Sequence, residues 1–427
     1  MIRWPGGCYS DRYQWRDGIG ERAVRTNAAW GGTVEPNTFG THEFFNLTER
    51  LGAKTYLNIN LGTGTPKDAA DWLEYITATV GDRADERRAN GRDDPWTIDY
   101  LAIGNETWGC GGHMTPVHYI HVYKRYATFL KAPEGNRPKR VASGGSNEDT
   151  AWTEALASGT PGSLIDGVSH HYYTLPTGNW PKKGNSTGFP EAEWISTLAN
   201  TMKVDDYLAA NAAVLDEHDP EGRIGIYLDE WGTWYDPEEG HEPGFLYQQN
   251  SLRDALVAAL NFNIFHRHTK RLHMANIAQT VNVLQAVVLT EGDRMVRTPT
   301  YHAFMLYKPF MDATFIPVAF DDMSDYEVGD VAVPHLSASA ALTPDGDLVV
   351  ALVNLHASEA ANVSGRFAGF DPAGARGLTL TGDTIDAHNT FDAPNAVEPR
   401  PAELDFDDGV LELTLPARSV TVVTLKK

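Results

Sequence analysis

Residues 98–112, "IDYLAIGNETWGCGG", combine a short apolar run with a polar pair at the point where the run stops. The run is rich in β-branched and aromatic residues and is followed by Gly104, a composition typical of a buried strand. Asn105 and Glu106 come next, where the chain is still largely enclosed, and a half-buried carboxylate is costly unless it has partners or a function. The stretch therefore predicts a buried strand over 98–106 that presents Glu106 at its carboxyl end.

Strand-like stretches of this kind recur from the N-terminus to about residue 280. They cover residues 2–7, 55–62, 98–106, 139–146, 165–173, 223–231 and 273–280. Amphipathic helices are predicted between them; in residues 250–262, Leu252, Leu256 and Leu260 recur with the spacing of one helical face. The alternation predicts an α/β fold with a parallel sheet, either open and doubly wound or closed as a (β/α)8 TIM barrel. No G-x-G-x-x-G follows a strand, and polar residues cluster at the strand ends, so the barrel is favoured.

The pattern changes near residue 313. Residues 335–342 and 347–355 alternate apolar and polar positions around the turn Pro344-Asp345-Gly346, and "SVTVVTL" (419–425) reads as a last strand. Such segments are typical of antiparallel sheets. We expect a catalytic barrel over 1–312 and a C-terminal antiparallel β-sandwich over 313–427.

The composition excludes several classes of protein. The 427 residues carry a formal net charge of -22, which argues against a nucleic acid partner, because phosphates call for a basic surface. No apolar stretch approaches the length of a membrane span, so no membrane partner is expected. "MIRWPGGCYS" lacks the pattern of a secretory signal, and a cytoplasmic location is predicted.

Polar side chains stand at the carboxyl ends of the predicted strands, where a TIM barrel has its active site. Two of them are glutamates, Glu106 and Glu230, on strands separated by two others. Facing carboxylates without a His/Cys ligand cluster suggest glycoside hydrolysis rather than metal chemistry, so neither a metal nor a cofactor is expected. The other strand-end residues are neutral amides, an imidazole and aromatic rings, which suit sugars: Asn60, Asn105, His171, Tyr173, Trp231, Trp234 and Gln279.

Each of these residues also has a structural interpretation. His171 alone could be a satisfied core histidine, and its aromatic neighbours could be packing. Strand-end amides such as Asn60 and Gln279 often satisfy loop backbone. Asp229 precedes Glu230, so strand alternation predicts that it points into the helix layer in a structural role.

At these residues the sequence resembles the α-L-arabinofuranosidases of glycoside hydrolase family 51. The resemblance lies in the ordered motifs "RWPGGCYSDRYQWRDGIG", "NTFGTHEFF", "NINLGTGT", "GNETWGCGG", "VSHHYY", "LDEWGTWYD" and "IAQTVNVL". It implies a retaining enzyme that removes terminal non-reducing arabinofuranosyl residues from arabinoxylan, arabinan or arabino-oligosaccharides, and a homo-oligomer. Glu106 would be the acid/base and Glu230 the nucleophile. The implied furanose pocket comprises Asn60, Asn105, His171, Tyr173, Trp234 and Gln279.

The chain departs from the family in one respect. It starts on a strand that resembles the family's second, so the family's first strand and a sugar-binding glutamate on it are expected to be absent, and the barrel is expected to have seven strands. Two alternatives therefore stay open. One is an endo-β-glycanase with the same two-glutamate barrel, and the other is an inactive carbohydrate-binding remnant.

The two cysteines also allow two interpretations. Cys8 follows the first predicted strand and Cys110 follows Glu106, so both belong to loops on the same face of the barrel. A disulfide between them would hold the loop after Glu106 against the mouth, provided that their Cα atoms lie within about 7 Å. Two reduced thiols in a cytoplasmic protein are the alternative.

Overall fold

The computed structural model describes residues 1–146 and 149–427, whose contacts divide the chain into two compact units. The first unit comprises Met1–His171, Tyr207–Glu230 and Lys270–Asn276. The second comprises Tyr172–Asp206, Trp231–Thr269 and Ile277–Lys427. Within the described residues, no helix has both the length and the apolar character that crossing a bilayer requires.

A seven-stranded sheet forms the centre of the first unit, and its strands follow one another in chain order. Pairing is parallel, for example Tyr56 with Tyr100 and Val141 with Gly167. The strands are β1 (Ile2–Trp4), β4 (Thr55–Ile59), β5 (Tyr100–Ile103), β6 (Lys139–Ser143), β7 (Gly167–Thr174), β8 (Gly225–Thr233) and β9 (Leu272–Ile277). Each of the seven predicted strands is present, which confirms the α/β barrel class.

The sheet curls until its two edges approach each other. Arg3 on the edge strand β1 lies 2.7 Å from Glu230 on β8, the strand next to the opposite edge. The interior between them is filled by one apolar cluster from β4, β5, β6, β8 and β9: Tyr56, Ala102, Val141, Tyr227 and Met274. The seven strands therefore make a nearly closed barrel with a packed interior.

The helices begin at residues that favour helix starts. Thr65 accepts a hydrogen bond from the Asp68 N–H and Pro66 follows it, so α2 (Pro66–Thr77) has both a capping box and proline at its first turn.

The first unit contains α1 (Thr41–Leu51), α2, α3 (Asp82–Ala89), α4 (Pro116–Phe129), α5 (Thr150–Gly159) and most of α7 (Val204–His218). It also contains a small hairpin that was not predicted, β2 (Arg25–Asn27) with β3 (Thr33–Glu35).

Helix α8 (Leu252–Arg267) in the second unit corrects the prediction of an amphipathic helix. Its polar residues Arg253, Asp254 and Asn261 are buried together with its leucines. Within this unit α8 contacts α6 (Glu191–Met202), α9 (Pro299–Tyr307) and strands of the C-terminal sheet, so no face is left for solvent. Each of these three residues makes hydrogen bonds; Asp254, for example, accepts one from the Tyr235 hydroxyl.

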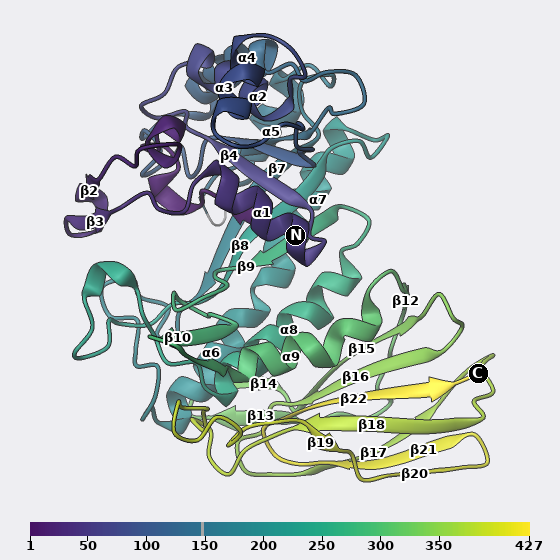
Figure 1. Ribbon diagram of the computed structural model, residues 1–427. Helices are drawn as coiled ribbons and strands as arrows, with labels where there is room; N and C mark the ends of the chain where they lie inside the picture. Colours follow the sequence, from purple (N-terminus) through teal and green to yellow (C-terminus); the bar gives the residue numbers. More distant parts are fainter. Residues whose placement is uncertain (147–148) are drawn as a thin grey trace. The chain divides into compact units, whose positions relative to one another are not determined.

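The C-terminal residues form an antiparallel sandwich (Figure 1). Its larger sheet contains β12 (Thr314–Ile316), β15 (Leu336–Leu342), β16 (Leu348–Asn354), β22 (Ser419–Lys426), β18 (Gly374–Leu380) and β19 (Arg400–Pro401). Its smaller sheet contains β17 (Ala361–Arg366), β21 (Val410–Leu415) and β20 (Leu404–Asp407). The predicted hairpin around 344–346 is confirmed by the pairing of Leu342 with Leu348. The domain boundary at 312/313 stays a prediction; β12 begins just after it, although the second unit also includes α6, α8 and α9.

Two short hairpins complete the second unit. They are β10 (Val288–Glu291) with β11 (Arg294–Arg297) and β13 (Asp325–Val328) with β14 (Val331–Pro334). Neither was predicted from the sequence.

Candidate active site

Glu106 lies in a tight loop just past β5, and not on the strand itself as predicted. The strand ends at Ile103 because Gly104 turns the chain with a φ of 85°. Glu106 itself adopts a φ of 41°, a left-handed conformation that costs a non-glycine residue free energy of order 1 kcal/mol or more. Such a residue persists only where its surroundings fix it, and the N–H of Thr107 donates to the Ser143 hydroxyl on β6. The aim of the Glu106 carboxyl therefore depends on contacts between loops.

Asp11 makes the most extensive of these contacts, and sequence reasoning missed it. Its buried carboxylate accepts N–H hydrogen bonds from Leu61 and Gly62 after β4, at 2.8 and 3.1 Å, and from Asn105 after β5, at 2.8 Å. Burial raises the pKa of Asp11 to about 6, against the lowering effect of the three N–H groups. Asp11 thus joins three loops at the barrel mouth. An acidic residue within the turn "GGCYSDRY" was the signal that could have found it.

The two glutamates predicted to face each other do so across His171. The His171 Nδ1 atom lies 2.7 Å from Glu106 Oε1 and 3.5 Å from Glu230 Oε2. A carboxylate oxygen of Glu106 and one of Glu230 lie within 4.8 Å of each other. The Glu106 and Glu230 side chains are 21% and 11% exposed, so both are enclosed but accessible from the mouth.

Arg3 holds the Glu230 side of the site. Its guanidinium donates to Glu230 Oε1 at 2.7 Å, to Asn105 Oδ1 at 2.7 Å and to Asn58 Oδ1 at 3.2 Å. Burial alone lowers the pKa of Arg3, but the carboxylates of Asp229 and Glu230 outweigh it and the pKa is raised. Sequence reasoning also missed Arg3 and Asn58, although a charged residue within the first buried strand was a visible signal.

Asp229 lies inside the barrel, which contradicts the prediction that it points into the helix layer. Its carboxylate accepts hydrogen bonds from the Ser169 hydroxyl at 2.6 Å and the Tyr56 hydroxyl at 2.7 Å, and lies 3.5 Å from Arg3 Nε. The prediction was wrong because it counted the alternation from Glu230. Both residues contact Arg3, which strict alternation along a strand does not allow.

His171 is a buried cation among three carboxylates. Burial alone lowers its pKa, but the carboxylates of Glu230, Asp229 and Glu106 outweigh burial and raise the pKa to about 10. For Asp229 burial acts in the opposite direction and raises the pKa. The charges of Arg3 and His171 outweigh burial, so the pKa of Asp229 is lowered. His171 is therefore a charged member of the site, unlike the satisfied core histidine of the structural interpretation.

The two predicted amides differ in what their side chains do. The Asn60 side chain donates to the Tyr13 carbonyl and accepts from the N–H groups of Thr63 and Gly64, so it is occupied by loop backbone. In contrast, Asn105 Nδ2 is a buried donor with no hydrogen-bond partner in the part of the chain that the structure describes. Asn105 therefore offers the site a donor, whereas the contacts of Asn60 support its structural interpretation.

The remaining predicted residues belong to the second unit. Tyr173 and Trp234 are half-buried and pack edge to face, with ring centroids 4.9 Å apart. Trp180, which was not predicted, completes this aromatic group at 5.2 Å from Trp234 and is 45% exposed. Gln279 is exposed in the segment just after β9.

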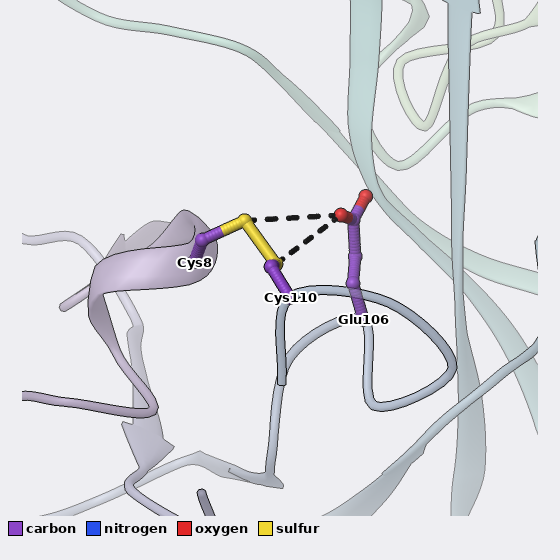
Figure 2. A group of neighbouring side chains, drawn as sticks. All are labelled: Cys8, Glu106 and Cys110. Carbon is purple, nitrogen blue, oxygen red and sulfur yellow. Dashed lines mark hydrogen bonds between the residues drawn. A yellow bond between two sulfur atoms is a disulfide. The ribbon is translucent and has the colours of Figure 1, made fainter. Parts of the chain in front are cut away.

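Cys8 and Cys110 form a disulfide, with their Cα atoms 5.6 Å apart. Figure 2 shows both sulfurs beside the carboxyl group of Glu106, at 4.0 and 3.6 Å from the same oxygen, Oε2. A disulfide sulfur carries no hydrogen, so only a protonated Glu106 can donate along these two contacts. The bond joins the segment after β1 to the loop that carries Glu106.

Two groups of side chains in the described part of the chain bring metal-type donor atoms within 4.8 Å of one another. They are Cys8, Glu106 and Cys110, and Glu106, His171 and Glu230. The sulfurs of the first group are bonded to each other. In the second group the protonated imidazole of His171 has no free lone pair for a cation. In this structure the donor atoms of both groups therefore contact other protein atoms.

Comparison with known proteins identifies the family. The model of the α-L-arabinofuranosidase 1 domain matches residues 1–193, and that of the α-L-arabinofuranosidase C-terminal domain matches residues 229–419. An intracellular exo-α-L-arabinofuranosidase of Bacteroides ovatus is 43% identical over the whole of this chain, which covers 84% of that relative. The chain belongs to the α-L-arabinofuranosidases of glycoside hydrolase family 51.

Solved structures of arabinofuranosidases have the same fold. The family 51 enzyme of Xanthomonas axonopodis pv. citri is 46% identical, with a TM-score of 0.97, and the match covers all of this chain and 87% of that one. An arabinose complex of the enzyme from Thermotoga maritima is 29% identical, with a TM-score of 0.85 and coverage of 100% and 87%. The chain is thus a glycoside hydrolase.

Proposed function

We propose that this chain hydrolyses terminal non-reducing α-L-arabinofuranosyl residues of arabinoxylan, arabinan or arabino-oligosaccharides with retention of configuration. The observation that carries the mechanism is the approach of the Glu106 and Glu230 carboxylates to within 4.8 Å. Retaining enzymes place the two carboxyl groups about 5 to 5.5 Å apart, whereas inverting enzymes leave about 6.5 to 9.5 Å for a water molecule. This close approach of two carboxylate oxygens favours the shorter spacing of a retaining enzyme.

In the first step Glu230 attacks the anomeric carbon while Glu106 gives its proton to the departing glycosidic oxygen. The bond from the sugar to the leaving group breaks as the bond to Glu230 forms, so a glycosyl-enzyme ester results. In the second step Glu106 takes a proton from water, and the hydroxide attacks the same carbon and releases arabinose and ionised Glu230. Arg3 donates to Glu230 Oε1 and so holds the attacking carboxylate in place.

The charges of the site support these roles. Arg3 and His171 are cations, and Asp229 and Glu230 are carboxylates that contact them. The two positive and two negative charges cancel, so these four residues together with a protonated Glu106 have no net charge. His171 Nδ1–H donates to Glu106 Oε1, which places the proton of the acid on Oε2. Asp229 acts through His171 and Arg3 and is a positioning residue.

Substrate recognition is proposed for the remaining residues. The unpaired Nδ2 donor of Asn105 suits a sugar hydroxyl near the anomeric carbon, a contact that would strengthen in the transition state. Tyr173 and Trp234 would stack on or bound the furanose, and Gln279 would bind its hydroxyls. Asn60 would shape the loop that borders the pocket rather than contact the sugar.

The proposed location and assembly rest on related proteins. The Bacteroides ovatus relative is named intracellular, and this supports the predicted cytoplasmic location. The predicted homo-oligomer rests on the family resemblance alone.

Two variants test the roles of the glutamates. Glu230→Ala should abolish turnover of an aryl α-L-arabinofuranoside, and azide should partly restore it by attacking in place of the missing carboxylate. Glu106→Ala should lose far more activity on an arabino-oligosaccharide than on a substrate with an activated leaving group, because only a poor leaving group needs protonation. Near wild-type rates of both variants on the oligosaccharide would refute the assignment. Binding of arabinose without turnover by the wild-type chain would instead support the carbohydrate-binding remnant.

A further inference from the structure

The disulfide next to Glu106 encloses a set of atoms that suits a metal ion once the bond is reduced. We propose that the reduced chain binds a thiophilic divalent cation such as Zn²⁺ through Cys8, Cys110 and Glu106, and that this cation blocks catalysis. The inhibitory effect rests on the proposed role of Glu106, whereas the binding site itself does not.

The distances around Glu106 Oε2 already fit such a site. With Zn–S bonds of about 2.3 Å and a Zn–O bond of about 2.0 Å, a tetrahedral ion places each sulfur about 3.5 Å from the oxygen. The sulfurs of Cys8 and Cys110 lie 4.0 and 3.6 Å from Oε2. The same geometry requires about 3.8 Å between the sulfurs, which is ordinary contact between two unbonded sulfur atoms. A rotation of the two side chains, with little movement of the backbone, is enough to build the site.

Reduction is feasible because one end of the bond reaches the surface. Cys110 is exposed, and Cys8 is partly exposed. A small dithiol attacks one sulfur as its thiolate, forms a mixed disulfide, and then closes into its own cyclic disulfide while Cys8 and Cys110 become thiols. Two electrons pass from the dithiol to the protein. The thiols then release two protons as their sulfurs bind the cation.

The remaining groups of the site explain why Oε2 would be the ligand. Glu106 Oε1 already accepts the hydrogen bond from His171 Nδ1. Arg3 occupies Glu230 Oε1 in the same way. Only Oε2 of Glu106 faces the sulfurs. The ion would therefore have three protein ligands, this oxygen and the two sulfurs, and a water molecule in its fourth position.

The consequence for catalysis follows from the position of the proton. In the proposed mechanism the acid proton of Glu106 is on Oε2, the same atom that would bind the ion. A bound cation therefore removes the general acid and places positive charge where the leaving group must depart. The oxidised chain lacks thiolates, so the same cation should have little effect on it.

Co²⁺ provides a test that needs no activity, because thiolate ligands give it an intense near-ultraviolet charge-transfer band and tetrahedral geometry gives it visible bands. The chain is reduced with dithiothreitol without oxygen, freed of reductant, and titrated with Co²⁺ and then with Zn²⁺ as competitor. We expect both sets of bands in the reduced chain, their loss on adding Zn²⁺, and none in the oxidised chain. Glu106→Gln should weaken binding by roughly tenfold or more because a protein ligand is lost. Glu134→Gln, which changes an exposed glutamate, is the matched control.

The kinetic test uses the same preparations with an aryl α-L-arabinofuranoside. Zn²⁺ should inhibit the reduced chain at concentrations at least roughly tenfold lower than the oxidised chain, and a chelator should reverse the inhibition. The double variant Cys8→Ser/Cys110→Ser, compared with its own metal-free rate, should lose this sensitivity. Equal inhibition of reduced and oxidised chains, or Co²⁺ bands that are unchanged in Glu106→Gln, would overturn the proposal. Co²⁺ binding that is equally tight in the folded and the denatured reduced chain would also overturn it. Co²⁺ binding without inhibition would keep the site and refute the role of Glu106 as acid.

Discussion

The barrel interior beneath the mouth and the core of the C-terminal sandwich are both buried, but they are built from different chemistry. The sandwich core consists of aliphatic side chains from both sheets, including Leu352, Leu413, Leu415 and Val423. The barrel encloses Asp229 in contact with both Arg3 and His171. Apolar packing is roughly additive and tolerant of exchange, whereas a buried charge depends on each of its partners. The first kind of core provides stability, and the second fixes a reactive geometry at a cost in stability.

The largest effect is expected from Asp229→Ala, which leaves Arg3 and His171 without their shared carboxylate. Removing one partner of a buried ion pair costs about 3–5 kcal/mol in the free energy of unfolding. Because Arg3 and His171 also hold the two glutamates, kcat/KM should fall by about a hundredfold or more. Denaturant unfolding and steady-state kinetics measure the two effects. Asp392→Ala, at a 96% exposed side chain, is the control and should change neither. A stable and active Asp229→Ala variant would show that the charged interior is not coupled.

The sandwich offers the opposite case in Leu415, which is fully buried. Leu415→Ala should cost about 2–5 kcal/mol in unfolding free energy through lost burial and the cavity that remains. Leu415→Met conserves volume and should cost less than about 1.5 kcal/mol. Neither change should alter kcat or KM below the unfolding transition. If Leu415→Ala lowered kcat, the sandwich would contribute to the chemistry as well as to stability.

Asp11→Asn tests whether the loops at the mouth are set by one buried acceptor. The amide keeps the size of the carboxylate but turns an NH₂ group toward at least one backbone N–H. The mismatch should cost about 1–3 kcal/mol in unfolding free energy. Misplacement of Asn105 and Glu106 should lower kcat by up to about a hundredfold. Crystallography of the variant would show whether Glu106 keeps its left-handed conformation. An unchanged kcat would mean that the Thr107 and Ser143 contact alone positions the loop.

His171 should also make the stability of the folded chain depend on pH. Its folded-state pKa, about 10, lies above the ordinary value of 6.5. The stability that its charge contributes is therefore fully present below pH 6.5 and is lost as pH rises from 6.5 through about 10. The difference in unfolding free energy between wild type and His171→Asn should narrow over that window. A difference that stays constant from pH 6 to 10 would indicate that His171 is neutral in the folded chain.

Much of the fold was visible in the sequence, because a buried parallel strand is a continuous apolar run and a tight turn has its own residues. Residues 100–103 show the first signal, and the turn at 344–346 shows the second. The partners of the site were not visible, since Arg3 meets Glu230 only when the sheet curls through seven strands. Asp229 was misplaced because the alternation was counted from Glu230, whereas both residues contact Arg3.

The sequence also did not decide the state of the two cysteines or the residue at which the strand before Glu106 ends. The sequence placed Cys8 and Cys110 on one face but gave no distance, so it could not decide between a disulfide and two thiols. Strand propensity predicted a strand that continues to Glu106. In the structure the strand ends at Ile103, because Gly104 turns the chain and the Asn105 N–H donates to Asp11. These errors lie where contacts between distant segments override local preference.

The stereochemistry of the first product tests the central claim most directly. The claim is that Glu106 and Glu230 form a retaining pair, and the approach of their carboxylates to within 4.8 Å supports it. Proton NMR during rapid hydrolysis of an aryl α-L-arabinofuranoside would resolve the anomeric signal of released arabinose before mutarotation. We expect the α-furanose to appear first and the β form later. First appearance of the β-furanose would mean single displacement by water and would contradict the assignment of Glu230 as nucleophile.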